Sequence, residues 1–342
     1  MSFSLLPSLN NDICKVISSN IIKPYYKLLD WINIDNLNYD YLSYNPKAID
    51  FLRKNKDKIN WKLLSRNPNS IKLLQENPDN IDWQYLSNNP NAIEILNQNQ
   101  DKIDWYYLSR NPNAIEILNE NKDKIIWKFL CVNSNPEAME ILKQNPDNID
   151  WMWLCNNPNA IEIFNENKDK INYKSLSRII NIDVIEILKE NLDKVDWTLL
   201  SGNPNAIEIL KENKDKINWV YLSGNPNAIE ILNDNFDKIN WALLSGNPNA
   251  IQLLRDNIDK IDWYWFSLNK NEEALDILRD NIDKIDWLNL SQNQNLKAIE
   301  LLKDNQDKID WILFSGNPSI FELEIDNNEL ETITKAISIY FS

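Results

Sequence analysis

The side chains of this sequence that could do chemistry are carboxylates, amides and aromatic rings, and most of them recur at fixed spacing. The chain has 51 Asp and Glu residues but no His, so the commonest general base and metal ligand is missing. The sequence has no Gly-rich phosphate loop, CxxC pair or nucleophile elbow. Carboxylates that return once per repeat are typical of a scaffold. We therefore expect no enzymatic activity, no catalytic residues, no cofactor and no metal.

A more informative position is a variable slot two residues after a recurring aromatic residue. Its side chain changes in size and polarity along the chain, whereas the next position is almost always Leu. If the slot is exposed, it forms an aromatic stripe of the kind enriched at interface hot spots. If it is half-buried, the rings simply fill space beside the core, and the sequence leaves both interpretations open. The candidate partner-binding residues are Tyr85, Tyr107, Phe129, Trp153, Tyr221 and Trp265.

The elements that position these residues are near-copies of one 22-residue unit. The unit is marked by an aromatic residue that returns every 22 residues, or every 24 in four places. Self-similarity at such a period indicates a repeat protein. The thirteen marker aromatics, which bound twelve full units, are Tyr39, Trp61, Trp83, Trp105, Trp127, Trp151, Tyr173, Trp197, Trp219, Trp241, Trp263, Trp287 and Trp311.

Each unit has the signals of a first helix with a defined start and stop. Asn89 can cap the first turn, and Pro90 suits the first helical position, so about nine helical residues are expected. Asn99 and its equivalents end this helix in all twelve units. Because Asn tolerates the left-handed conformation, we expect these residues to be C-terminal caps.

A second, shorter helix follows in each unit. Asp82, Asp104 and Asn218 stand where they can cap its N-terminus, directly before a marker aromatic. Trp105 and Leu108 lie three residues apart and so share one face of this helix. We expect the marker aromatics to pack in the core.

A two-helix unit of this size cannot bury its own apolar face, so the units must stack. The sequence predicts an all-α fold, an α-solenoid of about 12–13 stacked two-helix repeats of 22–24 residues, shaped as a curved rod about 100–130 Å long. The predicted organisation is an N-terminal helical cap (1–38), the repeat solenoid (39–318) and a C-terminal capping helix (319–342), with individual helices expected at 11–19, 24–31 and 329–341.

Four connections between the short helix and the next long helix carry two extra residues. Because all four fall at the same place in the unit, that edge must lie outside the stacked core. The additions either vary for binding or have drifted in a solvent loop, and both interpretations stay open. The longer connections are 131–138, 177–184, 267–274 and 291–298.

The overall charge bears on the class of partner. The net charge is −15 with a pI near 4.6, which argues against nucleic-acid binding and favours a protein partner with a basic segment. The chain has no run of 18 apolar residues, so no membrane contact is expected, and we expect no signal peptide. Three cysteines are consistent with a reducing, intracellular compartment and not with secretion. The oligomeric state is not indicated.

The runs N-P-N-A-I-E-I-L, N-x-D-K-I and D-W-x-x-L-S, which cover residues 39–318, resemble the tandem 22-residue helical repeats of uncharacterised proteins of giant DNA viruses of amoebae (mimivirus-like). The resemblance implies a viral α-helical repeat protein, located in the host cytoplasm or associated with the virion, with no activity to carry over. The regular motif is lost at residues 173–184 and at both ends.

The expected function is a non-catalytic interaction scaffold that binds a protein partner along its concave face. Two alternatives remain. Leu6 and Pro7, followed by Ile13, Val16 and Ile17, are similar to the opening of F-box segments, which implies a substrate-receptor adaptor of a ubiquitin ligase. The chain could also be a structural protein associated with the virion.

Overall fold

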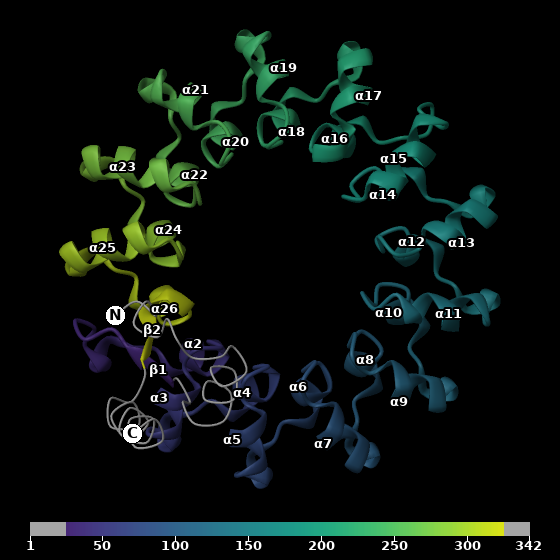
Figure 1. Cartoon of the computed structure of the whole chain (residues 1–342), viewed down its shortest axis with the longest axis vertical. Helices are drawn as coiled ribbons and strands as arrows, with labels where there is room; N and C mark the ends of the chain where they lie inside the picture. The colour runs from purple at the N-terminus through teal and green to yellow at the C-terminus, as the bar shows by residue number, and fades with distance from the viewer. Residues whose placement is uncertain (1–24, 325–342) are drawn as a thin grey trace, which may run out of the picture.

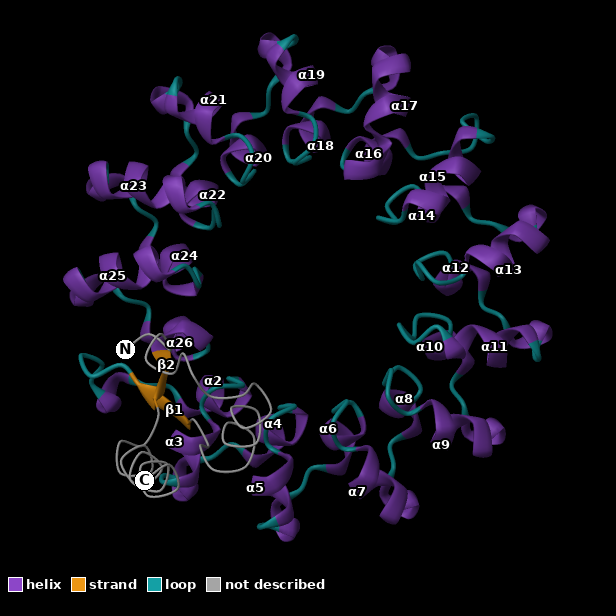
Figure 2. Cartoon of the chain, viewed as in Figure 1, coloured by secondary structure: helices purple, strands orange, loops and turns teal. Residues whose placement is uncertain are grey.

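The computed structural model describes residues 25–324, and over this range the chain forms a closed ring of helices (Figure 1). The even-numbered helices form an inner row, and the odd-numbered helices form an outer row. We call them the inner and outer helices, and each inner helix with the outer helix that follows it makes one layer. Helices and loops account for nearly all of the described chain, apart from one small sheet (Figure 2). The expected all-α repeat fold is confirmed.

Each inner helix begins at a marker aromatic, and in all but one layer an Asp or Asn side chain caps it. Asp104 accepts hydrogen bonds from the N–H groups of Tyr106 and Tyr107 at 3.0 and 3.3 Å, as predicted. The inner helices are α2 (Tyr39–Tyr44), α4 (Trp61–Arg66), α6 (Trp83–Ser87), α8 (Trp105–Leu108), α10 (Trp127–Leu130), α12 (Trp151–Leu154), α14 (Tyr173–Leu176), α16 (Trp197–Ser201), α18 (Trp219–Ser223), α20 (Trp241–Ser245), α22 (Trp263–Ser267), α24 (Trp287–Gln292) and α26 (Trp311–Ser315).

Most outer helices are shorter than the nine residues predicted, because the N-P-N-A segment forms a turn and not the first helical turn. The four longer connections have a different effect: their extra residues extend α11, α15, α23 and α25 at the N-terminus. The outer helices are α3 (Ile49–Arg53), α5 (Ile71–Gln75), α7 (Ile93–Gln98), α9 (Ile115–Glu120), α11 (Glu137–Lys143), α13 (Ile161–Glu166), α15 (Ile182–Lys189), α17 (Ile207–Glu212), α19 (Ile229–Asn233), α21 (Ile251–Arg255), α23 (Glu272–Asp280) and α25 (Leu296–Asp304).

The constant Asn after each outer helix is a C-terminal cap, but not in the left-handed conformation that was predicted. Asn99 has φ −135°, and its Nδ2 donates to the carbonyl of Ile95 at 2.9 Å. No residue of the described chain has a positive φ. The chain instead enters a one-turn 3-10 helix in most layers: η3 (Lys56–Lys58), η4 (Pro78–Asn80), η5 (Gln100–Lys102), η6 (Lys122–Lys124), η7 (Pro146–Asn148), η8 (Lys168–Lys170), η10 (Lys214–Lys216), η11 (Phe236–Lys238), η12 (Ile258–Lys260), η13 (Ile282–Lys284) and η14 (Gln306–Lys308), with η2 (Ile34–Asn36), η9 (Pro204–Ala206) and η15 (Pro318–Ile320) elsewhere.

A buried ladder of asparagines holds successive layers together. Asn89 donates from Nδ2 to the carbonyls of Ser65 and Asn67 in the preceding layer at 3.0 and 2.8 Å, and its Oδ1 accepts from the N–H of Asn91. The side chain therefore starts its own turn, as predicted, and also joins two layers. Ile179 holds the thirteenth slot, and the ladder residues are Asn45, Asn67, Asn89, Asn111, Asn133, Asn157, Asn203, Asn225, Asn247, Asn269, Asn293 and Asn317.

The apolar core runs without a break around the ring, between the inner and outer helices. Leu64 of an inner helix and Ala92 and Leu96 of the outer row are fully buried. The marker Trp residues pack against this core, as predicted, but are half-buried. The Nζ of Lys124, in the one-turn helix that follows α9, lies 4.8 Å from the ring centroid of Trp105. Such a contact is worth about 0.5–1 kcal/mol at a partly exposed site.

The ring closes where the two ends of the described chain meet. Strands β1 (Tyr25–Leu28) and β2 (Phe321–Glu324) pair antiparallel, with Tyr25 opposite Glu324 and Leu28 opposite Phe321. The backbone N–H of Asn38 donates to Ser315 Oγ at 2.8 Å, which is the same bond that joins Asn60 to Ser43 one layer on. The small sheet occupies the place of an outer helix in this layer (Figure 1).

The solenoid is therefore not the curved rod about 100–130 Å long that was predicted, because its two ends meet and the chain is a ring. Each layer is rotated slightly relative to its neighbour, and in a solenoid this small rotation sets the curvature. Thirteen inner helices that complete one turn need a rotation of about 28° per layer. Local sequence patterns reveal the layers but not this angle.

The sequence-based expectations for the ends have separate outcomes. The helix predicted at 24–31 is wrong, because Tyr25–Leu28 is a strand that is completed by the other end of the chain. The helices predicted at 11–19 and 329–341, and the F-box-like residues, lie outside the described residues.

Candidate interaction surface

One side of every inner helix is turned away from the core. Residues of a helix are about 100° apart around its axis, so the first, fourth and fifth positions of an inner helix cluster on one side. These are the marker aromatic, the buried Leu or Phe and the buried Ser or Cys. The second, third and sixth positions lie on the opposite side. The outer helices lie outside the inner row (Figure 1), so we infer that this opposite side is turned toward the centre of the ring.

These three positions define a continuous surface, which we call the inner surface. None of the second- or sixth-position residues is buried. The second positions are Asp40, Lys62, Gln84, Tyr106, Lys128, Met152, Lys174, Thr198, Val220, Ala242, Tyr264, Leu288 and Ile312. The sixth positions are Tyr44, Arg66, Asn88, Arg110, Val132, Asn156, Arg178, Gly202, Gly224, Gly246, Leu268, Gln292 and Gly316. The third positions are the variable slot, together with Tyr41 in the first layer.

The predicted aromatic stripe lies on this surface, but its members differ in exposure. Tyr221 and Trp265 are 46% and 39% exposed, whereas Phe129 is buried at 6%. Tyr85, Tyr107 and Trp153 are half-buried. Both interpretations of the variable slot therefore hold in part. Some of its side chains are exposed on the inner surface, and others pack against rings of the neighbouring layer.

Consecutive layers place their aromatic rings side by side. Tyr85 stacks on Tyr107 with ring centroids 6.4 Å apart, and Phe129 meets Trp153 edge to face at 5.6 Å. The ring of Tyr106, a second-position residue, connects these two pairs. Its centroid lies 5.2 Å from that of Tyr107 and 4.2 Å from that of Phe129. The structure thus joins four of the predicted residues into one aromatic run across α6 to α12. Tyr221 and Trp265 are separate from it.

Charge is distributed unequally between the inner surface and the rest of the chain. The inner surface carries six cations and a single carboxylate, Asp40. Its charge of +5, in a chain of net charge −15, leaves −20 for all other residues. The cations are confined to α4 through α14 and the residues just after them, and the layers from α16 to α26 have an uncharged inner surface. We call the first part the basic arc, with Lys62, Arg66, Arg110, Lys128, Lys174 and Arg178, and the second part the neutral arc.

The cations of the basic arc form no ion pair with a carboxylate of the described chain. Three of them instead lie over aromatic rings. Lys62 Nζ is 5.0 Å from the ring centroid of Tyr85, and Lys128 Nζ is 5.0 Å from that of Phe129. The guanidinium of Arg66 is 5.9 Å from the ring of Tyr44. Their charges are therefore available to an anionic group.

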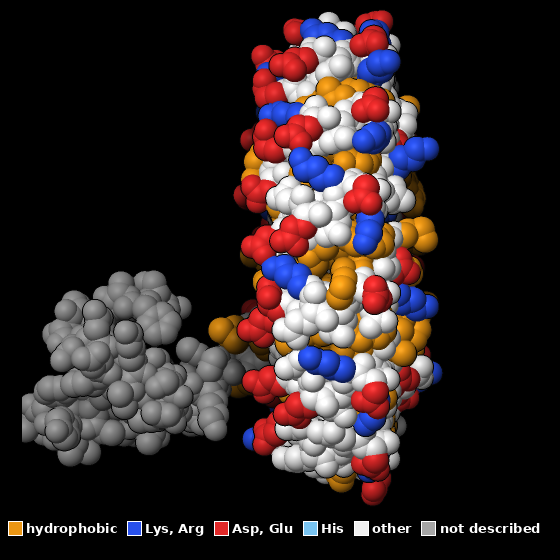
Figure 3. Space-filling view, turned by 90° about the vertical axis from the view of Figure 1, so that its right-hand side faces the viewer, with side chains coloured by type: hydrophobic (Ala, Val, Ile, Leu, Met, Phe, Trp, Pro, Cys, Tyr) orange, Lys and Arg blue, Asp and Glu red, His pale blue; other side chains and the backbone are white. Residues whose placement is uncertain are grey.

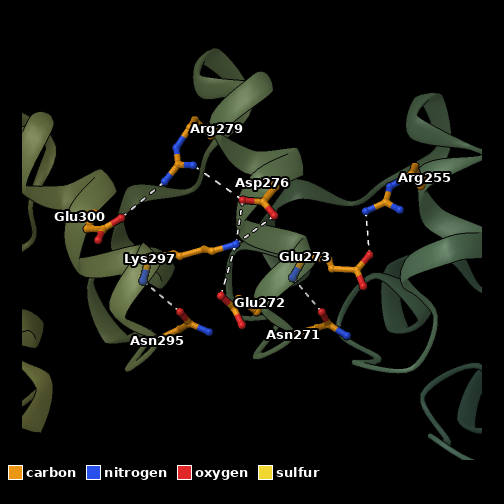
Figure 4. Close-up of polar contacts among 9 residues, drawn as sticks. All are labelled: Arg255, Asn271, Glu272, Glu273, Asp276, Arg279, Asn295, Lys297 and Glu300. Atoms are coloured by element: carbon orange, nitrogen blue, oxygen red, sulfur yellow. Dashed lines mark hydrogen bonds and ion pairs between the residues drawn. The ribbon is translucent and has the colours of Figure 1, made fainter. Parts of the chain in front are cut away.

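Many cations of the outer row, in contrast, are paired across layers. Lys297 of α25 contacts Asp276 of α23 at 3.0 Å, and Arg255 of α21 contacts Glu273 at 2.8 Å (Figure 4). The same bridging pattern joins Arg53 to Glu76. Carboxylates therefore lie beside cations from layer to layer, and this alternation is visible on the outer rim (Figure 3).

These ion pairs shift the pKa values of their members in the expected direction. The hydrogen bond from Lys143 lowers the pKa of the Glu162 carboxyl, and the one from Lys211 lowers that of Glu230. These paired carboxylates of the outer rim are thus held in their charged form by lysines within the chain. A basic external partner that approached Glu162 or Glu230 would have to compete with these lysines.

The second and sixth positions of the inner helices are not among the candidate residues predicted from the sequence. They look variable and mostly polar, which is typical of any solvated face. A signal was nevertheless present: across 26 such positions in a strongly acidic chain, only Asp40 is acidic. Grouping the repeats by position would have shown this, but recognising these positions as the inner side of a ring required the structure.

Apart from the inner surface, the described residues form a pocket on the outer row. A shallow pocket between α13 and α15 has Lys168, Asp183 and Glu190 in its lining, and Lys168 and Glu190 already pair at 2.9 Å. Residues 25–324 contain no group of three or more His, Cys, Asp or Glu that could hold a metal. No helix in this range is long and apolar enough to cross a membrane.

Fold and surface together define a class of protein, a closed ring of α-helical repeats. Its charged outer rim carries ion pairs between layers, and its inner surface is divided into a basic and a neutral arc. Comparison with protein families, with curated proteins and with solved structures found no match for the chain.

Proposed function

We propose that this protein is a non-catalytic interaction scaffold whose inner surface binds a protein partner. The observation that carries the proposal is the contrast between the two sides of the ring. Exposed rings and aliphatic side chains gather on the inner helices, whereas the outer helices are rich in charged side chains, several of which pair between layers. Exposed aromatic residues next to apolar ones are typical of interface hot spots.

The size of the ring limits what the partner can be. With neighbouring helices about 8–10 Å apart, thirteen inner helices enclose a circle about 33–41 Å across, measured between helix axes. Subtracting one helix diameter of about 10–12 Å leaves an opening of about 20–30 Å. The partner contacts the inner surface with a segment, a loop or a helical hairpin, which enters from one of the two flat sides of the ring.

The proposal is tested by removing apolar side chains from the neutral arc. In the triple variant Val220→Ser, Tyr264→Ser, Leu288→Ser, three side chains that are 45%, 52% and 49% exposed become small and polar. We expect the native ring to retain a protein partner in affinity capture from cells that express it and the variant to lose it. Circular dichroism should show similar melting for both.

The matched control changes exposed apolar residues away from the inner surface. The variant Ile258→Ser, Ile282→Ser, Leu296→Ser removes side chains that are 38%, 44% and 72% exposed. It should keep the partner. Loss of the partner with this control, but not with the neutral-arc variant, would place the binding surface on the outer side and overturn the proposal.

Two finer points rest on the sequence alone. The resemblance to repeat proteins of giant viruses supports a site of action in the host cytoplasm or the virion. The F-box-like residues support an adaptor function as the second candidate, and deletion of residues 1–20 should then abolish capture of a ubiquitin-ligase core while the inner surface still binds its partner.

A further inference from the structure

The partition of charge points to the chemistry of the bound segment. We propose that the basic arc binds an acidic segment of a polypeptide, which lies in extended conformation along α4 to α14. This inference rests on the proposed function and adds the chemical class of the partner. It replaces the basic partner segment expected from the overall charge of −15, because the carboxylates that make up this charge lie elsewhere.

The first argument is that the basic arc is not neutralised from within. Lys62, Arg110 and Lys174 have exposed side chains and form no ion pair in the described chain. Lys and Arg of the outer row, such as Arg255 and Lys297, contact carboxylates of adjacent layers. An acidic segment would supply to the inner cations what the outer helices supply to one another. Complementary charges of this kind direct encounter and fix register.

The second argument is that the cations are held in place by aromatic rings. Lys62 and Lys128 lie over the rings of Tyr85 and Phe129, at 5.0 Å in both cases. Each of these rings is itself held by a ring of a neighbouring layer, Tyr107 or Trp153. A cation with a restricted position loses less side-chain entropy when it binds a carboxylate. The rings also offer apolar surface between the charges.

The third argument concerns length. The basic arc extends over six inner helices, from α4 to α14, which is five of the thirteen steps around the ring. Along an opening about 20–30 Å across, these steps cover an arc of about 25–35 Å. An extended polypeptide rises about 3.3 Å per residue, so about 8–11 residues would cover the arc. A straight helix of the same span would leave the curved surface at both ends. An extended segment can follow it.

The neutral arc argues against double-stranded nucleic acid as the occupant. A duplex in the centre would present phosphates in all directions, and neutralising phosphates with Lys and Arg provides most of its binding energy. The layers from α16 to α26 carry no charge on their inner surface. A polypeptide can combine an acidic stretch with apolar residues that reach the neutral arc. Single-stranded nucleic acid remains a competing outcome of the test, since it also combines anionic groups with stacking surfaces.

The test measures binding of defined probes to the full chain by fluorescence anisotropy. The acidic probe is a fluorescein-labelled 16-residue peptide with Glu at every second position and Ser or Leu between them. The comparison probes are the same peptide with Lys in place of Glu, and a 16-nucleotide oligothymidine. We expect the acidic peptide to bind best, with an affinity that falls as salt rises from 50 to 200 mM, as screening requires.

Charge reversal on the two sides of the ring supplies matched variants. The inner variant is Lys62→Glu, Arg110→Glu, Lys174→Glu, and the outer variant is Lys54→Glu, Lys214→Glu, Lys303→Glu. Both change the net charge equally, and the outer lysines are exposed and form no ion pair in the described residues. The inner variant should bind the acidic peptide at least about tenfold more weakly and the outer variant within about twofold of the native chain.

The outcomes are decisive in each direction. Stronger binding of the Lys peptide, stronger binding of oligothymidine, or equal effects of the two variants would overturn the assignment. If the inner variant melts early, the corresponding Gln substitutions replace it. Affinity capture separates this inference from the proposed function: a partner lost with the neutral-arc variant but retained by the inner charge variant refutes only the acidic segment, and a partner retained by both refutes the inner surface as the binding site.

Discussion

The side-chain amide of Asn45 donates hydrogen bonds to the carbonyls of Ser315 and Asn317, both at 3.1 Å. These residues are 270 and 272 positions apart in the chain, yet the two bonds repeat those that Asn67 makes to the layer before it. The first and last layers are therefore stacked as neighbours. The ring has no free end in its described part, so the ladder continues through the closing joint.

The closing joint gives the first prediction. Deletion of residues 319–342 removes β2 and with it the partner of β1, while all inner helices remain. We expect the ring to open into an arc. Without the strand pairing, only the contacts between α2 and α26 would join the two ends, and these are of the same kind as the contacts between other neighbouring inner helices. Small-angle scattering should show a larger radius of gyration and a longer maximum dimension than for the native chain.

A shorter deletion, of residues 325–342, is the control, since it keeps both strands. It should leave the scattering profile of a ring. An unchanged profile for the longer deletion would show that the stacking of α2 on α26 is sufficient for closure and that the strands are dispensable.

Closure is also what sequence reasoning could not reach. The spacing of Trp105 and the capping side chain of Asp104 predict the start of the inner helix from local sequence, and the structure confirms both. The pairing of Tyr25 with Glu324 has no local signal. Phe321–Glu324 alternates apolar and polar residues, but over only four positions, and each strand is completed by the other end of the chain. The rotation per layer is equally invisible, since it depends on how side chains fit between layers.

For the candidate surface, too, the sequence predicts the positions of the residues but not how exposed they are. The variable slot was identified from its changing side chains, but its exposure depends on the neighbouring layer. Tyr221 is exposed and lies beside Gly202, where an added Cβ would be in ordinary van der Waals contact with its ring at 3.6 Å. Phe129 is buried because Tyr106 and Trp153 pack against it. Such differences arise from pairs of residues about 22 positions apart, which a single unit does not reveal.

The asparagine ladder gives a second prediction. Asn111 is buried and donates to the carbonyls of Ser87 and Asn89 at 3.1 and 3.0 Å. Replacing it with Ala leaves two carbonyls without these donors, and an unsatisfied buried polar group costs about 1–3 kcal/mol. We expect Asn111→Ala to lower the free energy of unfolding by about 2–4 kcal/mol in urea denaturation.

Asn113 provides the comparison within the same layer. It is exposed and donates to the carbonyl of Pro90 at 2.9 Å. Asn113→Ala should cost only about 0.5–1.5 kcal/mol, the net value of one hydrogen bond. Equal losses for the two variants would contradict a special role of the buried ladder.

The third prediction concerns two thiols at the fifth position of inner helices, where other layers have Ser. Cys131 and Cys155 are fully buried and free, and burial raises the pKa of both, to about 11 for Cys131. The thiolate is the reactive form, so neither thiol should be ionised near neutral pH. In a Cys14→Ser variant, we expect almost no reaction with a thiol reagent at pH 8 in the folded state and two equivalents in denaturant. Rapid labelling of the folded chain would show that these layers open.

The outer ion pairs give the fourth prediction, on acid stability. Hydrogen bonds from Lys143 and Lys211 lower the pKa values of Glu162 and Glu230 below the ordinary value of 4.5. A lowered folded-state pKa stabilises the fold above the unfolded-state pKa, and this contribution is lost as the pH falls through the folded-state value. The melting temperature should therefore decline as the pH drops below about 4.5. Glu162→Gln, Glu230→Gln should melt slightly lower at pH 7 and show a smaller decline in acid.

The repeat itself supplies the control for this fourth prediction. Glu94 and Glu116 hold the same position in their outer helices as Glu162, but they form no ion pair within the described residues. The variant Glu94→Gln, Glu116→Gln should therefore follow the native melting curve from pH 7 down to pH 3. Because the two double variants differ only in whether the lost carboxylates had a lysine partner, a common response would assign the acid sensitivity to overall charge, and a difference would assign it to the pairs between layers.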